Sequence, residues 1–92
     1  MADETTSASV DFTTFVLSLG SSALVHLGDM SHPEAGNTSE NLLLARQTID
    51  ILAMLEEKTR GNLTAEEARF LRDLLADLRL RFVERSRAAR DA

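Results

Sequence analysis

The hydrophobic and polar positions from residue 12 to residue 27 differ in pattern from those of the rest of the chain. This stretch, FTTFVLSLGSSALVHL, contains no Asp, Glu, Lys or Arg. On a helix at about 100° per residue its apolar side chains cover well over half of the circumference. One face holds Phe12, Phe15, Val16, Leu19, Ala23 and Leu27, and the remaining strip holds the hydroxyl residues Thr14, Ser18, Ser21 and Ser22. The pattern predicts a mostly buried helix over residues 11–27, whose hydroxyl groups hydrogen-bond to its own carbonyls.

A membrane span is the competing interpretation of this apolar stretch. A span needs about 20 predominantly apolar residues. This stretch is shorter, and seven of its sixteen positions are Thr, Ser, Gly or His. We therefore expect no membrane span, and place the helix at the centre of a bundle or inside an oligomer.

Two further amphipathic helices follow, over about residues 41–60 and 65–87. The second helix has a broad apolar stripe, extended sideways by a row that contains Leu44, Ile51 and Leu55. The third begins at a capping box formed by Thr64 and Glu67. Because only a short turn at Gly61 separates the two, they are expected to form an antiparallel αα-hairpin. Their main stripes are Leu42, Ala45, Ile49, Leu52 and Ala53, and Ala68, Leu71, Leu74, Leu75, Leu78 and Phe82.

Residues with capping chemistry set the expected boundaries of these elements. N-cap candidates are Ser9 or Asp11 for the first helix and Asn37, Ser39 or Asn41 for the second. Gly28 and Gly61 fit the ends of the same two helices, where a left-handed residue is common. The sequence thus predicts a single helical domain over residues 10–87, with a long loop at 28–40, a disordered tail at 1–9 and a frayed tail at 88–92.

The predicted fold class is all-α: a central apolar helix plus an αα-hairpin, assembled into a homo-oligomeric helical bundle. If the hairpin stripes mainly face each other, only the row of Leu44, Ile51 and Leu55 receives the first helix. That row would leave several large apolar side chains of the first helix in water, at roughly 1.5–3 kcal/mol each. We therefore expect an obligate homo-oligomer, most simply a dimer. The predicted interface comprises Phe12, Phe15, Val16, Leu17, Ser18, Ser21 and Leu24.

Composition narrows the range of functions. The 92 residues include no Cys, so there is neither a disulfide framework nor a thiolate metal site. Trp and Tyr are absent and the formal net charge is −5, which argues against stacking on nucleic-acid bases and against binding to anionic surfaces. No basic segment followed by an apolar segment opens the chain, so the expected location is the cytoplasm.

Two groups of residues have the chemistry of a catalytic or metal site. His26, Asp29 and His32, with Glu34, have the residue types of a zinc or manganese site, but their spacing matches no stable ligand geometry. Ser22 and His26 lie one turn apart on a helix, without a third group to orient the histidine. The simpler interpretation is a histidine at a helix end beside a solvated loop, with no metal and no cofactor. Adjacent carboxylates such as Glu56 and Glu57 point about 100° apart and do not form a catalytic pair.

Positive charge gathers at the end of the chain. The segment RLRFVERSRAAR, residues 79–90, contains five Arg and one Glu. Part of this charge is explained by the helix macrodipole and by an i,i+4 pair between Asp77 and Arg81. The alternative is contact with an acidic partner, through Arg79, Arg81, Arg85 and Arg87.

Two segments of the chain resemble a known family. The run ARQTIDILAMLEEKTRGNLTAEE, residues 45–67, and the run DFTTFVLSLGSSALVHLG, residues 11–28, resemble the short bacterial proteins grouped as domain of unknown function 1844. The resemblance covers nearly the whole chain outside its expected tails, and its KTRGNLT turn is fairly specific. It implies a bacterial cytoplasmic protein and brings no reaction, ligand or catalytic residue with it.

The function expected from these observations is that of a non-enzymatic helical interaction or scaffold module. Its expected partner is a second copy of the chain, with another protein as a further candidate and no nucleic acid. The alternative is a small metal-dependent or hydrolytic enzyme that uses His26, Asp29 and His32. Metal analysis of the purified protein distinguishes the two.

Overall fold

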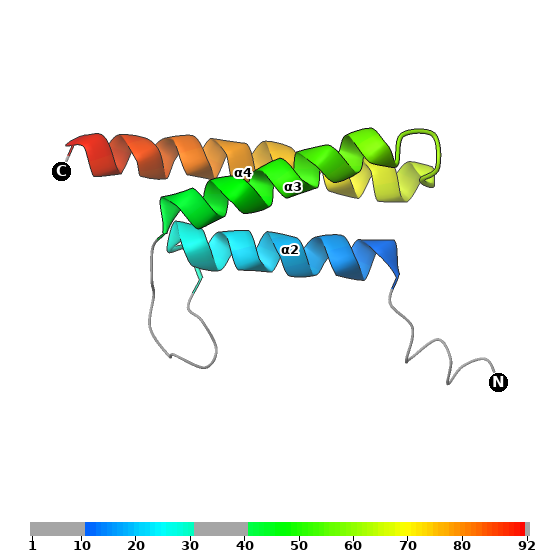
Figure 1. The fold of residues 1–92 in the computed structure, drawn as a ribbon, viewed down its shortest axis with the longest axis horizontal. Coiled ribbons are helices and arrows are strands. Elements are labelled where there is room, and N and C mark those ends of the chain that lie inside the picture. Colours follow the sequence, from blue (N-terminus) through cyan, green and yellow to red (C-terminus); the bar gives the residue numbers. More distant parts are fainter. Residues whose placement is uncertain (1–10, 31–40, 92) are drawn as a thin grey trace.

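The structure, a computed structural model, describes residues 11–30 and 41–91 and consists there of three helices (Figure 1). They are α2 (Phe12–Leu27), α3 (Leu42–Lys58) and α4 (Ala65–Asp91). Helices α2 and α4 run in the same direction, and α3 runs in the opposite direction. A hydrogen bond of 2.6 Å from the Asn41 backbone N–H to the His26 carbonyl joins the end of α2 to the start of α3. The expected all-α fold and the αα-hairpin of α3 and α4 are confirmed.

Each helix begins at a side chain that satisfies a free backbone N–H group. Asp11 accepts from the Thr14 N–H at 2.8 Å, and Asn41 accepts from the Leu44 N–H at 3.1 Å. At the start of α4, Glu67 N–H donates to the Thr64 hydroxyl at 3.1 Å, and Thr64 N–H donates to the Glu67 carboxylate at 2.9 Å. The capping box is therefore present with both of its hydrogen bonds. Of the cap candidates, Asp11 and Asn41 are used; Ser9, Asn37 and Ser39 lie outside the described residues.

Glycine in the left-handed conformation occurs at both predicted positions. Gly28 has φ 85° and closes α2: its N–H donates to the Val25 carbonyl, and the next N–H donates to the Leu24 carbonyl. This is the hydrogen-bond pattern of a Schellman motif. Gly61 has φ 87° in the turn between α3 and α4. Helix α3 itself stops at Lys58, two residues before the predicted end, where the Thr59 hydroxyl donates to the Leu55 carbonyl at 2.6 Å.

Helix α4 is longer than the sequence pattern predicted. It continues to Asp91, whereas the expected end was Arg87 with a frayed tail after it. The added residues Ala88, Ala89 and Arg90 are strong helix formers, and no Gly or Pro interrupts them. As a result, the end of α4 projects beyond α2 and α3 in Figure 1.

The core lies where the three helices meet. All three helices contribute to one cluster of buried side chains, and the predicted main stripes of α3 and α4 supply most of it. Helix α2 packs against both other helices. The buried members are Val16, Ala23, Leu27, Ala45, Ile49, Leu52, Leu71, Leu75 and Leu78.

The prediction of where the first helix packs was wrong in part. Leu55 does pack against the core, but Leu44 and Ile51 remain 39% and 42% exposed. Helix α2 instead lies in the groove between α3 and α4, so that Val16 and Leu27 are fully buried within a single chain. Apolar periodicity identifies which face of a helix is buried but does not say which neighbour covers it.

Candidate interaction surface

The outward strip of α2 carries small hydroxyl side chains and no charge. Ser18 and Ser22 are exposed, and the Ser18 hydroxyl donates to the Phe15 carbonyl one turn earlier at 2.8 Å. This hydrogen bond is the return to the helix backbone that the sequence predicted. An uncharged and shallow strip of this kind allows another helix to approach without removing charges from water.

Large apolar side chains border this strip. Phe15 on α2 is 41% exposed, and on α3 Leu44 and Ile51 are similarly exposed. Leu43 and Met54 are more exposed still. On a helical wheel these α3 positions fall within about 100° of one another. We call the set Phe15, Ser18, Ser22, Leu43, Leu44, Ile51 and Met54 the α2–α3 surface.

The two halves of the α2–α3 surface lie next to each other. One flank of α3 faces α4. This flank carries Arg46 and Asp50, which line a groove together with Phe82 and Val83 of α4. Ile51 lies on the other flank, which is next to α2. Gly20 of α2 lies against α4. On the helical wheel Phe15 falls on the opposite flank of the buried face of α2, which is the flank nearest to α3.

The residues predicted for an oligomer interface are distributed over three environments. Phe15, Leu17 and Ser18 are exposed, and Phe12, Ser21 and Leu24 are partly buried. Val16 is in the core of the single chain and is not available to a second copy. The contribution of α3 through Leu43, Leu44, Ile51 and Met54 was not foreseen, although the wide apolar arc of the second helix was the signal for it.

Asp29, immediately after the end of α2, is bound by two arginines of α4. Arg85 Nε donates to Asp29 Oδ1 at 2.9 Å, Arg85 Nη2 donates to the same oxygen, and Arg81 Nη1 donates to Oδ2 at 3.2 Å. Arg85 also donates to the Gly28 carbonyl at 3.4 Å. The Asp29 side chain is only 15% exposed, although the residue as a whole is exposed. Charged hydrogen bonds therefore connect the end of α2 to α4.

These contacts shift the pKa values of Asp29 and Arg81. Burial raises the pKa of the Asp29 carboxyl, but the hydrogen bonds from Arg85 and Arg81, together with their charges, lower it by more. The net pKa of Asp29 is therefore below its ordinary value. The pKa of Arg81 is raised, first by its hydrogen bond with Asp77 and then by that with Asp29.

The candidate metal ligands are not brought together by the described part of the chain. The Asp29 carboxylate already accepts from two guanidinium groups, which compete with any cation. His26 is partly buried at the end of α2. Within residues 11–30 and 41–91, no group of three or more His, Asp or Glu side chains is placed to hold a metal ion. His32 and Glu34 lie outside the described residues.

The four arginines predicted to contact an acidic partner fall into two pairs. Arg81 and Arg85 bind Asp29 of the same chain, and Arg81 also binds Asp77 at 2.8 Å as predicted. Arg79 and Arg87 are exposed on another side of α4. Of the four, Arg81 and Arg85 are therefore used within the chain, whereas Arg79 and Arg87 are exposed to solvent.

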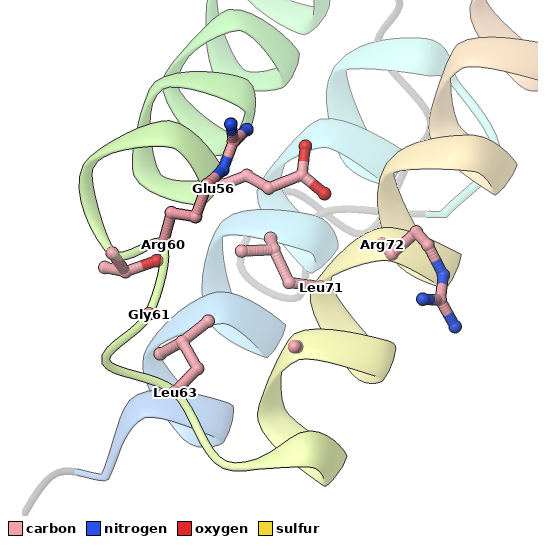
Figure 2. A pocket seen from close by; sticks show the side chains of 8 residues that line it. Glu56, Arg60, Gly61, Leu63, Leu71 and Arg72 are labelled. Carbon is pink, nitrogen blue, oxygen red and sulfur yellow. The ribbon is translucent and has the colours of Figure 1, made fainter.

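A hollow of about 220 Å³ lies at the turn between α3 and α4. Leu63 and Leu71 line it, and Figure 2 shows the Glu56 side chain reaching from α3 toward α4. The Arg72 guanidinium points away from Leu71 in this view. The polar groups around the hollow therefore do not converge on a common point, as groups that bind a small molecule would.

The comparison with protein families agrees with the resemblance of the two sequence segments. Neither the curated proteins nor the solved structures contain a match to this chain. In the described residues no helix is long and apolar enough to cross a membrane. The family described as domain of unknown function (DUF1844) matches residues 9–84, which is most of the chain. The chain belongs to this family.

Proposed function

We propose that the protein is a non-enzymatic helical module that associates with itself through the α2–α3 surface. The observation that carries this proposal is the exposure of Phe15, Leu44 and Ile51 on a small chain, within a set of side chains that carry no charge themselves. Exposed apolar areas of this kind mark protein interaction sites in soluble proteins.

The chemistry of this surface suits a symmetric dimer. In a two-fold interface the same area of each copy meets itself, so an uncharged area avoids repulsion between like charges. Ser18 and Ser22 allow close approach of two helices at the centre, while Phe15 and Ile51 supply apolar area around them. Full burial of one such large side chain contributes roughly 1.5–3 kcal/mol.

The enzymatic alternative based on His26, Asp29 and His32 has less support. Asp29 is occupied by Arg81 and Arg85, and its role in connecting α2 to α4 explains its position without a metal. Metal analysis distinguishes self-association from the enzymatic alternative. Stoichiometric zinc or manganese retained through dialysis would favour the enzyme.

The association is tested by measuring mass in solution as a function of concentration. Light scattering and sedimentation should give a homo-oligomer at micromolar concentration for the parent protein. Ile51→Arg should yield a folded monomer, because the substitution introduces a charge into the interface but removes no core side chain. Circular dichroism should show that helix content is kept.

Leu80→Arg is the matched control, since Leu80 is 59% exposed on α4 and lies outside the α2–α3 surface. It should leave the mass unchanged. A stable monomer of the parent protein at micromolar concentration would refute self-association. Equal dissociation by Leu80→Arg and Ile51→Arg would mean that a different surface is used.

A further inference from the structure

A groove between α3 and α4 lies on the flank of α3 opposite to the α2–α3 surface. It encloses about 330 Å³, and its lining combines apolar side chains with charged ones. Ile49 is buried and Phe82 is partly buried at its base, whereas Val83 is 45% exposed. The groove therefore offers apolar contact area that the chain itself does not cover.

Arginines follow the α4 side of this groove. Along α4, positions spaced by three or four residues fall on one side of the helix, and here they are either basic or apolar. The acidic residues of α4 fall elsewhere on the helical wheel. The positions are Arg72, Ala76, Arg79, Val83, Arg87 and Arg90.

Of these arginines, Arg72 lies 3.7 Å from Asp73, and the charges of Arg79 and Arg87 are the ones that matter for the groove. Within the described residues no carboxylate forms an ion pair with Arg79 or Arg87, in contrast to Arg81 and Arg85, which bind Asp29. The one acidic residue in the groove is Asp50, whose carboxylate is 4.0 Å from Arg46. Both of these side chains are mostly exposed, so their pairing is weak and can be exchanged for a partner's charges.

We propose that this groove binds an amphipathic helical segment of a partner protein that carries acidic residues beside its apolar stripe. Aliphatic side chains of the segment would rest on Ile49, Phe82 and Val83. Its carboxylates would pair with Arg79 and Arg87. This is the helix-in-groove mode of recognition, with charge complementarity setting the orientation.

A protein segment fits these features better than a nucleic acid or a membrane. The base of the groove is apolar, and the chain has no Trp or Tyr on which bases could stack. The net charge of −5 repels phosphate-rich surfaces at long range. A short peptide contacts only the groove and its arginines, so the negative charge elsewhere opposes it less.

The test uses the full chain and a fluorescent synthetic helical peptide, with leucines at i, i+3, i+4 and i+7 and glutamates on both sides of them. Fluorescence polarisation should show saturable binding. Arg79→Glu and Val83→Asp should each weaken it by about tenfold or more. Arg60→Glu is the matched charge control, in the turn that follows α3, and it should retain binding within about twofold. Ile51→Arg should also retain binding, which separates this groove from the association surface.

Three results would overturn the proposal. The first is no binding of the acidic peptide, and the second is equal binding of a peptide with glutamine in place of every glutamate. The third is tight binding of duplex DNA, or of vesicles of equal parts phosphatidylcholine and phosphatidylglycerol, that is lost with Arg79→Glu. Circular dichroism of each variant must match the parent, and Arg79→Gln provides a second variant if Arg79→Glu unfolds.

Discussion

Gly20 of α2 lies so close to Leu74 of α4 that a Cβ atom at Gly20 would be 2.9 Å from Leu74 Cδ2. Gly20 is buried, although glycine is unfavourable inside a helix. The missing side chain allows α2 to approach α4 closely, next to Val16 and Ala23 in the core. Gly20 therefore lowers the intrinsic stability of the helix but allows the close packing of α2 against α4.

Substitutions at Gly20 should consequently depend on size. Gly20→Val should lower the free energy of unfolding by about 2 kcal/mol through overpacking against Leu74. Gly20→Ala should stay within roughly 1 kcal/mol of the parent, since the end of the Leu74 side chain can move and alanine favours the helix. Urea unfolding followed by circular dichroism measures both. Adding Leu74→Ala should reduce the effect of Gly20→Val, and strictly additive effects would show that the two residues do not compete for space.

Gly61 gives a prediction that depends on backbone conformation alone. Its φ is 87°, and an added Cβ would meet no atom within 4 Å. Gly61→Val should therefore cost about 1–2 kcal/mol from the left-handed conformation without any clash. Gly61→Asn should cost less, because asparagine tolerates this region better. Equal melting temperatures for the parent and Gly61→Val would contradict the assigned turn.

The capping box at the start of α4 predicts a different pair of effects. Thr64→Ala removes the hydroxyl that accepts from the Glu67 N–H, and should lower the free energy of unfolding by about 1 kcal/mol. Thr64→Ser keeps the hydroxyl and should remain close to the parent. Thermal unfolding by circular dichroism compares the two variants. If serine destabilises as much as alanine, the threonine methyl group rather than the cap is responsible.

Features set by local chemistry could be predicted from the sequence. The caps at Asp11, Asn41 and Thr64 and the left-handed residues Gly28 and Gly61 each depend on a few neighbouring residues. Helical periodicity likewise identified the buried stripes of α3 and α4. These signals lie within one or two helical turns, which is the range that sequence patterns describe directly.

Features set by the arrangement of helices could not be predicted in this way. Of the row Leu44, Ile51 and Leu55 that was expected to cover α2, Leu55 packs against the core but Leu44 and Ile51 stay exposed, because α2 occupies the groove of the hairpin. Arg85 was one of four candidates for contact with an external acidic partner, whereas it binds Asp29, 56 residues earlier in the chain. The sequence shows where arginines cluster. It does not show which carboxylate each arginine pairs with, because that partner can lie far away in the sequence of the same chain.

The ion pairs of Asp29 with Arg81 and Arg85 give the protein a defined response to acid. The folded pKa of Asp29 is lower than its ordinary value of 3.8, so the charged form is favoured in the folded state. The resulting stabilisation is complete above the unfolded pKa and is lost as the pH falls through the folded pKa. Asp11 also has a lowered pKa, first because of the hydrogen bond from the Thr14 backbone, and it responds with the same sign.

Comparison of the parent with Asp29→Asn isolates the contribution of Asp29, since Asp11 is present in both proteins and cancels in the difference. The parent should be the more stable at neutral pH, because asparagine cannot form the charged pairs with Arg81 and Arg85. This difference in the free energy of unfolding should hold down to about pH 5 and shrink below about pH 4. Urea unfolding at a series of pH values measures it. Asp73→Asn is the control, because Asp73 lies 3.7 Å from Arg72 on the exposed surface, and it should have a smaller effect at neutral pH. A difference between the parent and Asp29→Asn that grows as the pH falls would mean that the folded pKa of Asp29 is raised, and that the two arginines do not hold its charged form.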